Sequence, residues 1–252
     1  MSRQFENKVV FITGAGSGIG QACAEAFAAQ GARVAVADIS QQAADETTTR
    51  ITQAGGQAFS LVGDVASAEQ VAAMVSQVVA RWGRLDIGLN NAGISSPLEP
   101  MGDTDESDFD RVMGVNVKGV WLCMRAQIRQ MLAQGGGCIV NMASALSLKV
   151  SVGSSFYVAS KFAVAGLTRT AAVEYAASGI RINAVCPGIV STPLFEKSVT
   201  DPDTIAMMKR YHPMDRFGTP EEIANAVLWL ASDASSFSTG ALMSVDGGWT
   251  AQ

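Results

Sequence analysis

The segment Thr13–Gly20 places four glycines in eight residues between two strongly patterned stretches of the chain. Val9–Thr13 is an apolar run typical of a buried strand, and Ile19–Gln30 has the periodicity of a helix that ends at Gly31. Glycines in such a turn let the backbone approach a phosphate, and the N-terminus of the following helix offers unpaired N–H groups with a partial positive charge. The segment therefore predicts a phosphate-binding turn that contains Gly14, Gly16, Ser17, Gly18, Ile19 and Gly20.

An acidic residue, Asp38, ends the next predicted strand, Arg33–Asp38. A carboxylate at this place can accept hydrogen bonds from the adenosine ribose hydroxyls of a dinucleotide, whereas a 2′-phosphate would bring a second anion against it. No Arg or Lys follows Asp38 directly, and the turn has no basic residue. The pattern predicts a site that prefers NAD to NADP. Two alternatives are a glycine turn without a ligand and an Asp38 that only caps the next helix.

Strands and helices alternate along the rest of the chain. Apolar runs predict further strands at Ala58–Val62, Leu85–Leu89, Cys138–Met142, Ile180–Cys186 and Leu242–Val245. Helical patterns cover Gln41–Ala54, residues 67–82, 106–132 and 155–177, and Pro220–Ser232. This order predicts one Rossmann-type α/β domain over residues 1–252, a doubly wound parallel sheet of about seven strands with helices on both faces. Residues 189–219 lack strong periodicity, and we expect them to form an irregular substrate loop that closes over the site.

The composition argues against several classes of function. The net charge is −5 and no basic run occurs, so we expect no nucleic-acid or anionic-membrane partner. No apolar run is long enough to span a membrane and the first residues have no signal-peptide core, so we expect a cytoplasmic protein. The 4 scattered cysteines and single histidine predict reduced, buried thiols and no metal site. A hydrolase is not expected, because no G-x-S-x-G motif occurs.

Further short motifs follow the glycine turn. They are Asp64-Val65, Asn90-Asn91-Ala92-Gly93, Asn116, Ser144, Tyr157-Val158-Ala159-Ser160-Lys161, Asn183, Pro187-Gly188, Ser238-Thr239-Gly240 and Val245-Asp246-Gly247-Gly248. Each motif alone is weak, but in this order and in these strand and helix contexts they resemble the classical short-chain dehydrogenase/reductase family over nearly the whole chain. The resemblance implies a nicotinamide-dependent oxidoreductase and a homotetramer with the two long helices packed between subunits.

The resemblance also implies roles around the cofactor. Asp64 and Val65 would hold the adenine edge. The adenosine ribose would be flanked by Asn91, Ala92 and Gly93. The nicotinamide would be lined by Pro187, Gly188, Ile189 and Thr192, with Ile189 and Thr192 touching its carboxamide, and Lys161 would bond its ribose. The alternatives are ordinary turn residues at Asn90 and Asn91 and a plain strand end at Pro187-Gly188.

Tyr157 and Lys161 lie one helical turn apart on the same face of a predicted helix. Hydride transfer between an alcohol and a nicotinamide requires a group that moves the hydroxyl proton, and an ordinary tyrosine loses its proton only at about pH 10. An ammonium about 4 Å away, at an effective dielectric constant of about 20, stabilises a phenolate by about 4 kcal/mol before desolvation. The pair therefore predicts a tyrosine acid/base assisted by a lysine. A buried aromatic residue with its hydroxyl bonded is the alternative.

Ser144 and Asn116 complete the predicted catalytic group. Ser144 follows the fifth strand, where open α/β sheets place ligands, and its hydroxyl can hold the substrate oxygen as the hydride moves. Asn116 would hold a water that contacts Lys161 and relays protons. The alternatives are a small residue at a strand end for Ser144 and a locally satisfied helix amide for Asn116.

A largely apolar substrate pocket is expected beside Ser144 and Tyr157. The further residues are chosen for their place after strand ends and in the irregular loop, and they are Ser95, Leu146, Leu194, Phe195, Met207 and Met208. Such side chains suit an uncharged hydrophobic or cyclic secondary alcohol or ketone, although ordinary core packing would also explain each of them. A 3-oxoacyl thioester reductase and a non-catalytic NAD-binding scaffold or sensor are the alternative functions. His212 is expected to be a structural or pocket-rim residue.

Overall fold

The computed structural model describes residues 3–252, apart from the side chains of Leu194, Lys197 and Ser198. Within this range a seven-stranded parallel sheet has the order β3-β2-β1-β4-β5-β6-β7. The strands are β1 (Val9–Thr13), β2 (Arg33–Asp38), β3 (Gln57–Val62), β4 (Ile87–Asn90), β5 (Gly137–Met142), β6 (Ile180–Pro187) and β7 (Leu242–Val245). The predicted doubly wound Rossmann-type sheet is therefore confirmed.

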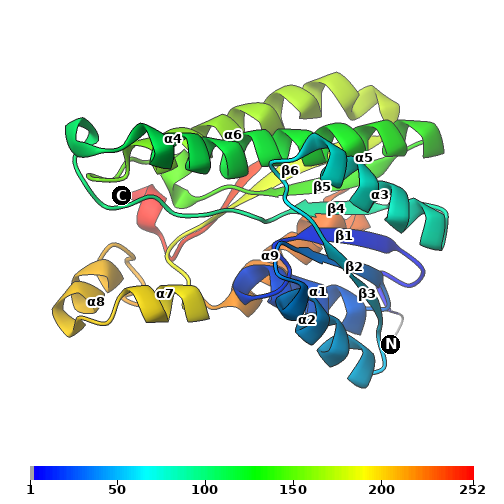
Figure 1. Cartoon of the computed structure of the whole chain (residues 1–252), viewed down its shortest axis with the longest axis horizontal. Helices are drawn as coiled ribbons and strands as arrows, with labels where there is room; N and C mark the ends of the chain where they lie inside the picture. The colour runs from blue at the N-terminus through cyan, green and yellow to red at the C-terminus, as the bar shows by residue number, and fades with distance from the viewer. Residues whose placement is uncertain (1–2) are drawn as a thin grey trace.

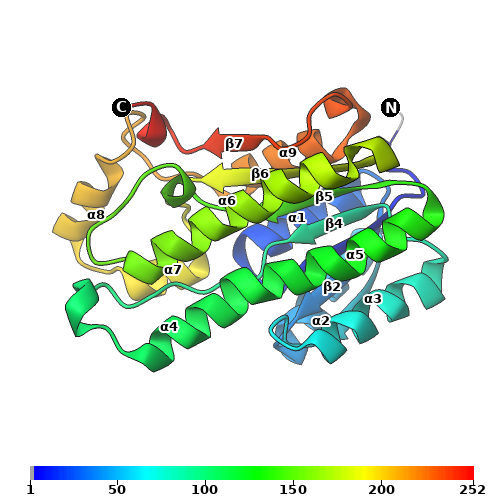
Figure 2. The ribbon, with the colours of Figure 1, turned by 90° about the horizontal axis from the view of Figure 1, so that it is seen from above.

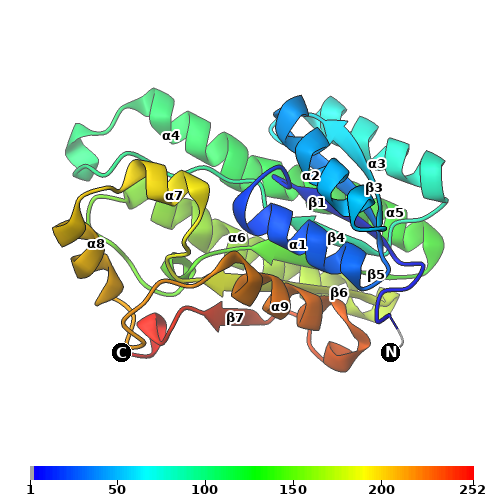
Figure 3. The ribbon, with the colours of Figure 1, turned by 90° about the horizontal axis from the view of Figure 1, so that it is seen from below.

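Helices cover both faces of this sheet (Figure 1). One face carries α1 (Gly18–Ala29), α2 (Gln41–Gln53) and α9 (Pro220–Ala231), which Figure 3 shows from below. The other carries α3 (Ala68–Trp82), α4 (Glu106–Met113), α5 (Val120–Gln134) and α6 (Ser155–Tyr175), seen from above in Figure 2. None of the helices in the described part of the chain is long and apolar enough to cross a membrane.

Alternation along the strands explains why both faces are covered. In β1, Val9 and Phe11 pack into the core beneath α3, α5 and α6, whereas Val10 and Ile12 pack into the core beneath α1 and α9. All four side chains are fully buried. A strand that is apolar on both sides has to be covered on both sides, which is the situation of a parallel sheet with right-handed crossovers.

The order of the strands reverses between β1 and β4. The chain leaves β1 toward β2 and β3 on one side of the sheet, then returns to place β4 on the other side of β1. A crevice forms outside the carboxyl ends of the strands at such a reversal, and ligands of open α/β sheets bind there. The glycine turn after β1 and the segment Asn91–Gly93 after β4 meet at this point.

The long helix expected over residues 106–132 is present, but it consists of α4 and α5 joined through a π-helical turn, Gly114–Gly119, that the sequence pattern did not predict. A second expectation about regular structure was wrong. The segment 189–219 is not wholly irregular, because it contains α7 (Pro193–Ser198) and α8 (Pro202–Lys209). Each of these short helices begins with proline and is capped by the preceding side chain, Thr192 or Asp201, so capping rather than periodicity defines them.

Candidate active site

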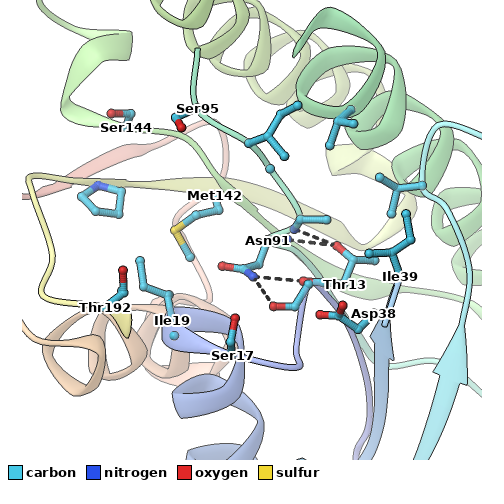
Figure 4. A pocket seen from close by; sticks show the side chains of 18 of the residues that line it. Thr13, Ser17, Ile19, Asp38, Ile39, Asn91, Ser95, Met142, Ser144 and Thr192 are labelled. Carbon is cyan, nitrogen blue, oxygen red and sulfur yellow. Dashed lines mark hydrogen bonds between the residues drawn. The ribbon is translucent and has the colours of Figure 1, made fainter. Parts of the chain in front are cut away.

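A cavity of about 470 Å³ opens at the carboxyl ends of β1, β2, β4, β5 and β6. It is elongated: Asp38 and Ile39 lie at one end, and Ser95 and Ser144 lie at the other (Figure 4). Side chains from distant parts of the sequence therefore line one continuous space. The lining includes most of the residues expected to bind a dinucleotide, namely Gly14, Ser17, Gly18, Ile19, Asp38, Asp64, Val65, Asn91, Ala92, Gly93, Tyr157, Lys161, Pro187, Gly188 and Thr192.

The glycine turn is held in a shape that larger residues could not adopt. Gly14 has a φ of +62°, and a Cβ atom there would lie 2.8 Å from the Cα of Ala92. A Cβ atom on Gly20 would overlap the carbonyl oxygen of Gly14 and would lie 2.5 Å from Nδ2 of Asn91. Gly20 does not line the cavity itself. Because it has no side chain, helix α1 can pack directly behind the turn.

Asn91 fastens this turn to the end of β4. Its Nδ2 donates to the carbonyl oxygens of Thr13 at 3.1 Å and Gly14 at 2.9 Å, as the dashed lines in Figure 4 show. Its backbone N–H donates to Oγ1 of Thr13 at 3.1 Å. The side-chain amide donor is thus committed to the backbone of the glycine turn.

The N-terminus of α1 has no side-chain cap. Ser17 occupies the N-cap position in an extended conformation, but its side chain accepts no hydrogen bond from the first turn of the helix. By contrast, Ser40, Ser67 and Thr219 cap α2, α3 and α9 with their side chains. The first N–H groups of α1 are therefore left for an anion, and together with the close glycine packing they fit the pyrophosphate of a dinucleotide.

Asp38 links the turn to the start of the second crossover. Its Oδ2 accepts the Gly16 N–H at 2.9 Å, and its Oδ1 accepts the Ser40 N–H at 3.0 Å. Gly16 does not line the cavity, and a Cβ atom there would lie 2.8 Å from Oδ2 of Asp38. The N-cap of α2 is Ser40 rather than Asp38. The Asp38 carboxylate lines the cavity. Each of its oxygens has a lone pair left that can accept a further hydrogen bond.

Tyr157 and Lys161 project from the first turns of α6 into the cavity. Lys161 is buried, and its Nζ donates to the carbonyl oxygen of Met142 at 3.0 Å. Nζ lies 5.5 Å from the centre of the Tyr157 ring. The ammonium and the phenol ring thus lie close together in the same cavity.

Ser144 lies at the end of β5, in the same part of the cavity. Its Oγ accepts the Leu146 N–H at 3.1 Å, so the hydroxyl proton is left to donate to another oxygen. Ser147, which the sequence motifs did not single out, ties this loop to α6. The Ser147 Oγ accepts the Ser144 N–H at 3.3 Å and donates to the Lys161 carbonyl oxygen at 2.8 Å.

Asn116 lies in the π-helical turn and behind the cavity wall. Its Oδ1 accepts the Ile94 N–H at 2.8 Å, and its Nδ2 donates to the Ile94 carbonyl oxygen at 2.9 Å and to Ser160 Oγ at 3.1 Å. The hydrogen-bonding groups of the side-chain amide are thus satisfied by neighbouring protein groups, which agrees with the alternative interpretation of Asn116 as a satisfied helix amide.

The segment after β6 differs from the sequence expectation at Ile189. Its N–H donates to His212 Nε2 at 3.0 Å and its carbonyl oxygen accepts the Gly218 N–H at 2.9 Å, so both of its backbone polar groups are committed elsewhere. Val190, not Ile189, lines the cavity. Val190 forms a parallel bridge with Gly218, in which its neighbours on either side make the hydrogen bonds. Its own N–H and carbonyl therefore point away from Gly218.

Only part of the expected substrate pocket lines the cavity. Ser95, Ser144 and Tyr157 do, whereas Leu146, Phe195, Met207 and Met208 do not. Leu146 is buried in the turn after Ser144, and Phe195 packs edge-on against Phe217. The side chain of Leu194 lies outside the described residues. Apolar lining residues that the sequence reasoning missed are next to motif positions and include Ile94, Val115, Met142, Ala143 and Pro193.

Comparisons with known proteins agree with this architecture. A family model described as enoyl-(acyl carrier protein) reductase matches residues 14–250. Cis-4-hydroxycyclohexanecarboxylate dehydrogenase of Sinomonas cyclohexanicum is 43% identical over 251 residues, which cover 100% of each chain. Cyclohexanol dehydrogenase of Acinetobacter sp. strain SE19 is 42% identical over 252 residues, which cover 100% of this chain and 98% of that protein.

A solved structure from Beutenbergia cavernae is also similar, with a TM-score of 0.94, 35% identity and 100% coverage of both chains. That protein is proposed to be an NAD(P)-dependent gluconate 5-dehydrogenase and holds NADP at low occupancy. A cavity that is lined by a glycine turn and a carboxylate as well as by Ser, Tyr and Lys side chains is typical of a dinucleotide-binding oxidoreductase. The chain belongs to the short-chain dehydrogenase/reductase family, which binds a nicotinamide dinucleotide.

Proposed function

We propose that this chain interconverts a secondary alcohol and a ketone, with Tyr157 as the acid/base and NAD as the preferred cofactor. One observation carries the proposal: one cavity is lined by Ser144, Tyr157 and Lys161 as well as by the glycine turn and Asp38, and Lys161 reaches both the Tyr157 ring and the end of the strand that precedes Ser144. A hydroxyl donor, an acid/base and an ammonium thus lie beside the space left for a nicotinamide.

The residues act on the substrate oxygen and its proton. The bound nicotinamide would supply or accept the hydride. Ser144 donates a hydrogen bond from its free O–H to the substrate oxygen and so fixes the position of that oxygen. Tyr157 removes the alcohol proton during oxidation and returns it during reduction, and the Lys161 ammonium stabilises the phenolate that this transfer leaves. Lys161 is itself held by the Met142 carbonyl, and Ser147 keeps Ser144 in register with α6.

The remaining cofactor contacts follow from the same placement. We propose that Asp64 and Val65 hold the adenine edge, that Ala92 and Gly93 lie against the adenosine ribose, and that Lys161 bonds the nicotinamide ribose. At the nicotinamide, Pro187, Gly188 and Thr192 are proposed to line the ring. Val190 replaces Ile189 as the backbone contact for the carboxamide, because its N–H and carbonyl are turned away from Gly218 while it lines the cavity.

The preference for NAD rests on Asp38. Its carboxylate already accepts two backbone N–H groups and lines the cavity, where a 2′-phosphate would meet a like charge. We expect kcat/KM with NAD to exceed that with NADP at least tenfold in the wild-type enzyme, a ratio equivalent to about 1.4 kcal/mol. In Asp38→Ser the two values should approach each other. An equal or higher kcat/KM with NADP in the wild-type enzyme would contradict the assignment.

The substrate is proposed to be an uncharged cyclic secondary alcohol or the corresponding ketone. Ile94, Val115 and Met142 give the cavity an apolar wall, and Lys161, which is assigned to Tyr157 and the cofactor, is the only Lys or Arg among the described lining residues. A substrate carboxylate would therefore lack a dedicated cation. The two cyclohexane-ring dehydrogenases among the relatives support a ring-shaped substrate.

A substrate panel tests this proposal. The enzyme is assayed with NAD and one candidate substrate at a time, and the formation of NADH is followed by absorbance. The candidates are cyclohexanol, cis-4-hydroxycyclohexanecarboxylate, gluconate and a 3-hydroxyacyl thioester. The uncharged ring alcohol should give the highest kcat/KM. A higher value for the thioester would favour the 3-oxoacyl thioester reductase instead. Tight NADH binding without turnover of any alcohol or ketone would indicate a non-catalytic scaffold or sensor.

A homotetramer is proposed as the assembly. The long helices leave large apolar side chains exposed on their outer faces, namely Phe109 on α4, Trp121 on α5 and Phe162 and Val173 on α6. Such a surface is typical of a face that is covered by another subunit. Light scattering coupled to gel filtration should give four times the monomer mass, and a monomer mass would contradict the proposal.

A further inference from the structure

The only histidine of the chain is buried behind the segment that follows β6. His212 is 2% exposed and lies between α8 and α9. Its ring centre lies 5.3 Å from that of Trp249 and 6.1 Å from that of Phe217. A Cβ atom on Gly188 would lie 2.7 Å from Nε2 of His212, so the imidazole reaches this strand end only because residue 188 is glycine.

The hydrogen bonds of the ring define its tautomer. Nε2 faces the Ile189 N–H at 3.0 Å, and a ring nitrogen that accepts an N–H bond carries no proton. The other nitrogen, Nδ1, lies 3.4 Å from the carbonyl oxygen of Lys209, which can only accept. The arrangement is therefore complete only for a neutral imidazole with its proton on Nδ1.

This bond controls which residue of the segment faces the cavity. His212 fixes the N–H of Ile189, and Gly218 fixes its carbonyl oxygen. With both polar groups of Ile189 held on the outer side, the next residue, Val190, turns toward the cavity, and Thr192 is placed to cap α7 at its rim. Without the Nε2 acceptor of His212, the Ile189 N–H would lose its hydrogen-bond partner.

We propose that His212 is a positioning residue that holds the Pro187–Thr192 segment in the conformation required to orient the nicotinamide. The inference rests on the proposed function, because it assigns the nicotinamide to this end of the cavity. It adds a residue that touches neither cofactor nor substrate and acts through the backbone of Ile189. The polar contact, rather than the bulk of the ring, is the essential property.

Two substitutions separate these properties. His212→Gln supplies an amide oxygen that can accept the Ile189 N–H, whereas His212→Leu keeps apolar bulk and removes the acceptor. We expect His212→Leu to raise the KM for NAD and the Kd for NADH about tenfold and to lower kcat. His212→Gln should recover most of both losses, although both variants should melt below the wild-type enzyme because each disturbs the contact with Trp249. Wild-type kinetic constants in His212→Leu, or equal kinetic losses in both variants, would overturn the proposal.

A second measurement needs neither turnover nor a stable variant. Because the chain has one histidine, its ring nitrogens give unambiguous signals in a long-range ¹H–¹⁵N correlation spectrum of uniformly ¹⁵N-labelled protein without cofactor. We expect a protonated Nδ1 and an unprotonated Nε2. A protonated Nε2 would overturn the proposal whatever the kinetics show. Failure to turn over any alcohol would instead refute the proposed function, and the spectrum would still report on the His212 contact.

Discussion

Gly20 offers the sharpest test of the glycine turn as the cofactor anchor. In Gly20→Ala the new Cβ atom would overlap the Gly14 carbonyl oxygen and would lie 2.5 Å from Nδ2 of Asn91. The Gly14 oxygen belongs to the backbone and the Asn91 amide is held by two hydrogen bonds, so the turn has to move. The movement sacrifices the two hydrogen bonds from Asn91 to Thr13 and Gly14. At about 0.5–1.5 kcal/mol each, their loss totals about 1–3 kcal/mol.

If most of this free energy appears in the binding of the dinucleotide, the Kd for NADH rises between about fivefold and about a hundredfold. Isothermal titration calorimetry measures this Kd directly, and thermal melting measures the part that appears as lost stability. Gly102→Ala is a suitable control, because a Cβ atom on Gly102 meets nothing within 4 Å. Binding of NADH by Gly20→Ala within twofold of the wild-type and control enzymes would refute the assignment of the turn.

Two further predictions concern groups whose pKa is shifted. Burial raises the pKa of the cysteine thiols, to about 12 for Cys23 and Cys123 and to about 11 for Cys138 and Cys186. A disulfide reagent at about pH 8 should therefore modify these thiols only after denaturation. Rapid modification of the native protein would contradict this prediction. The hydrogen bonds from Arg216 and the Thr219 N–H lower the pKa of Glu222 from 4.5 to about 2. The ionised Glu222 therefore contributes to stability above about pH 4.5, and this contribution is lost as the pH falls toward 2. Because the Arg216–Glu222 pair is exposed, Glu222→Gln should lower the free energy of unfolding by only about 1 kcal/mol at neutral pH. The difference in unfolding free energy between variant and wild-type protein, measured by urea denaturation, should shrink below about pH 4. A difference that persists undiminished to about pH 2 would contradict this role of Glu222.

The sheet could be predicted because its strands are short apolar runs between turn residues. The predicted range Arg33–Asp38 coincides with β2, and Val9–Thr13 coincides with β1. Both strands are buried on both faces, so nearly every position is apolar and the boundaries are sharp. The π-helical turn at Gly114–Gly119 could not be predicted in this way, because a change in the backbone hydrogen-bond pattern leaves the apolar spacing of a helix almost intact.

The candidate site was predicted best where a motif fixes both the residue and the strand end. Asp38 is the last residue of β2 and Ser144 lies two residues beyond the end of β5, so the sheet positions both of them at the cavity. The choice between Ile189 and Val190 could not be made from the sequence. It depends on long-range partners, Gly218 and His212, that set which side of an extended segment faces inward.

The substrate end was predicted least well. Met207 and Met208 were expected to line it because they lie in a segment without strong periodicity, but that segment forms α8, which does not contribute to the cavity lining. In Figures 1 and 3, α7 and α8 lie together at the end of the molecule that also contains the C-terminus. The position of a short helix relative to a cavity depends on tertiary packing, on which local sequence carries little information.

Tyr157 is proposed to move the substrate proton while other residues hold the cofactor. Tyr157→Phe removes only the hydroxyl, and the glycine turn, Asp38 and the Lys161–Met142 hydrogen bond do not depend on it. Turnover of a cyclic secondary alcohol by NAD and the Kd for NADH should therefore be measured on the same preparation of this variant. We expect a kcat at least about a thousandfold below the wild-type value, within the range of general acid–base catalysis, and a Kd for NADH within about threefold of the wild-type value. A kcat within tenfold of the wild-type value would contradict the proposed role of Tyr157.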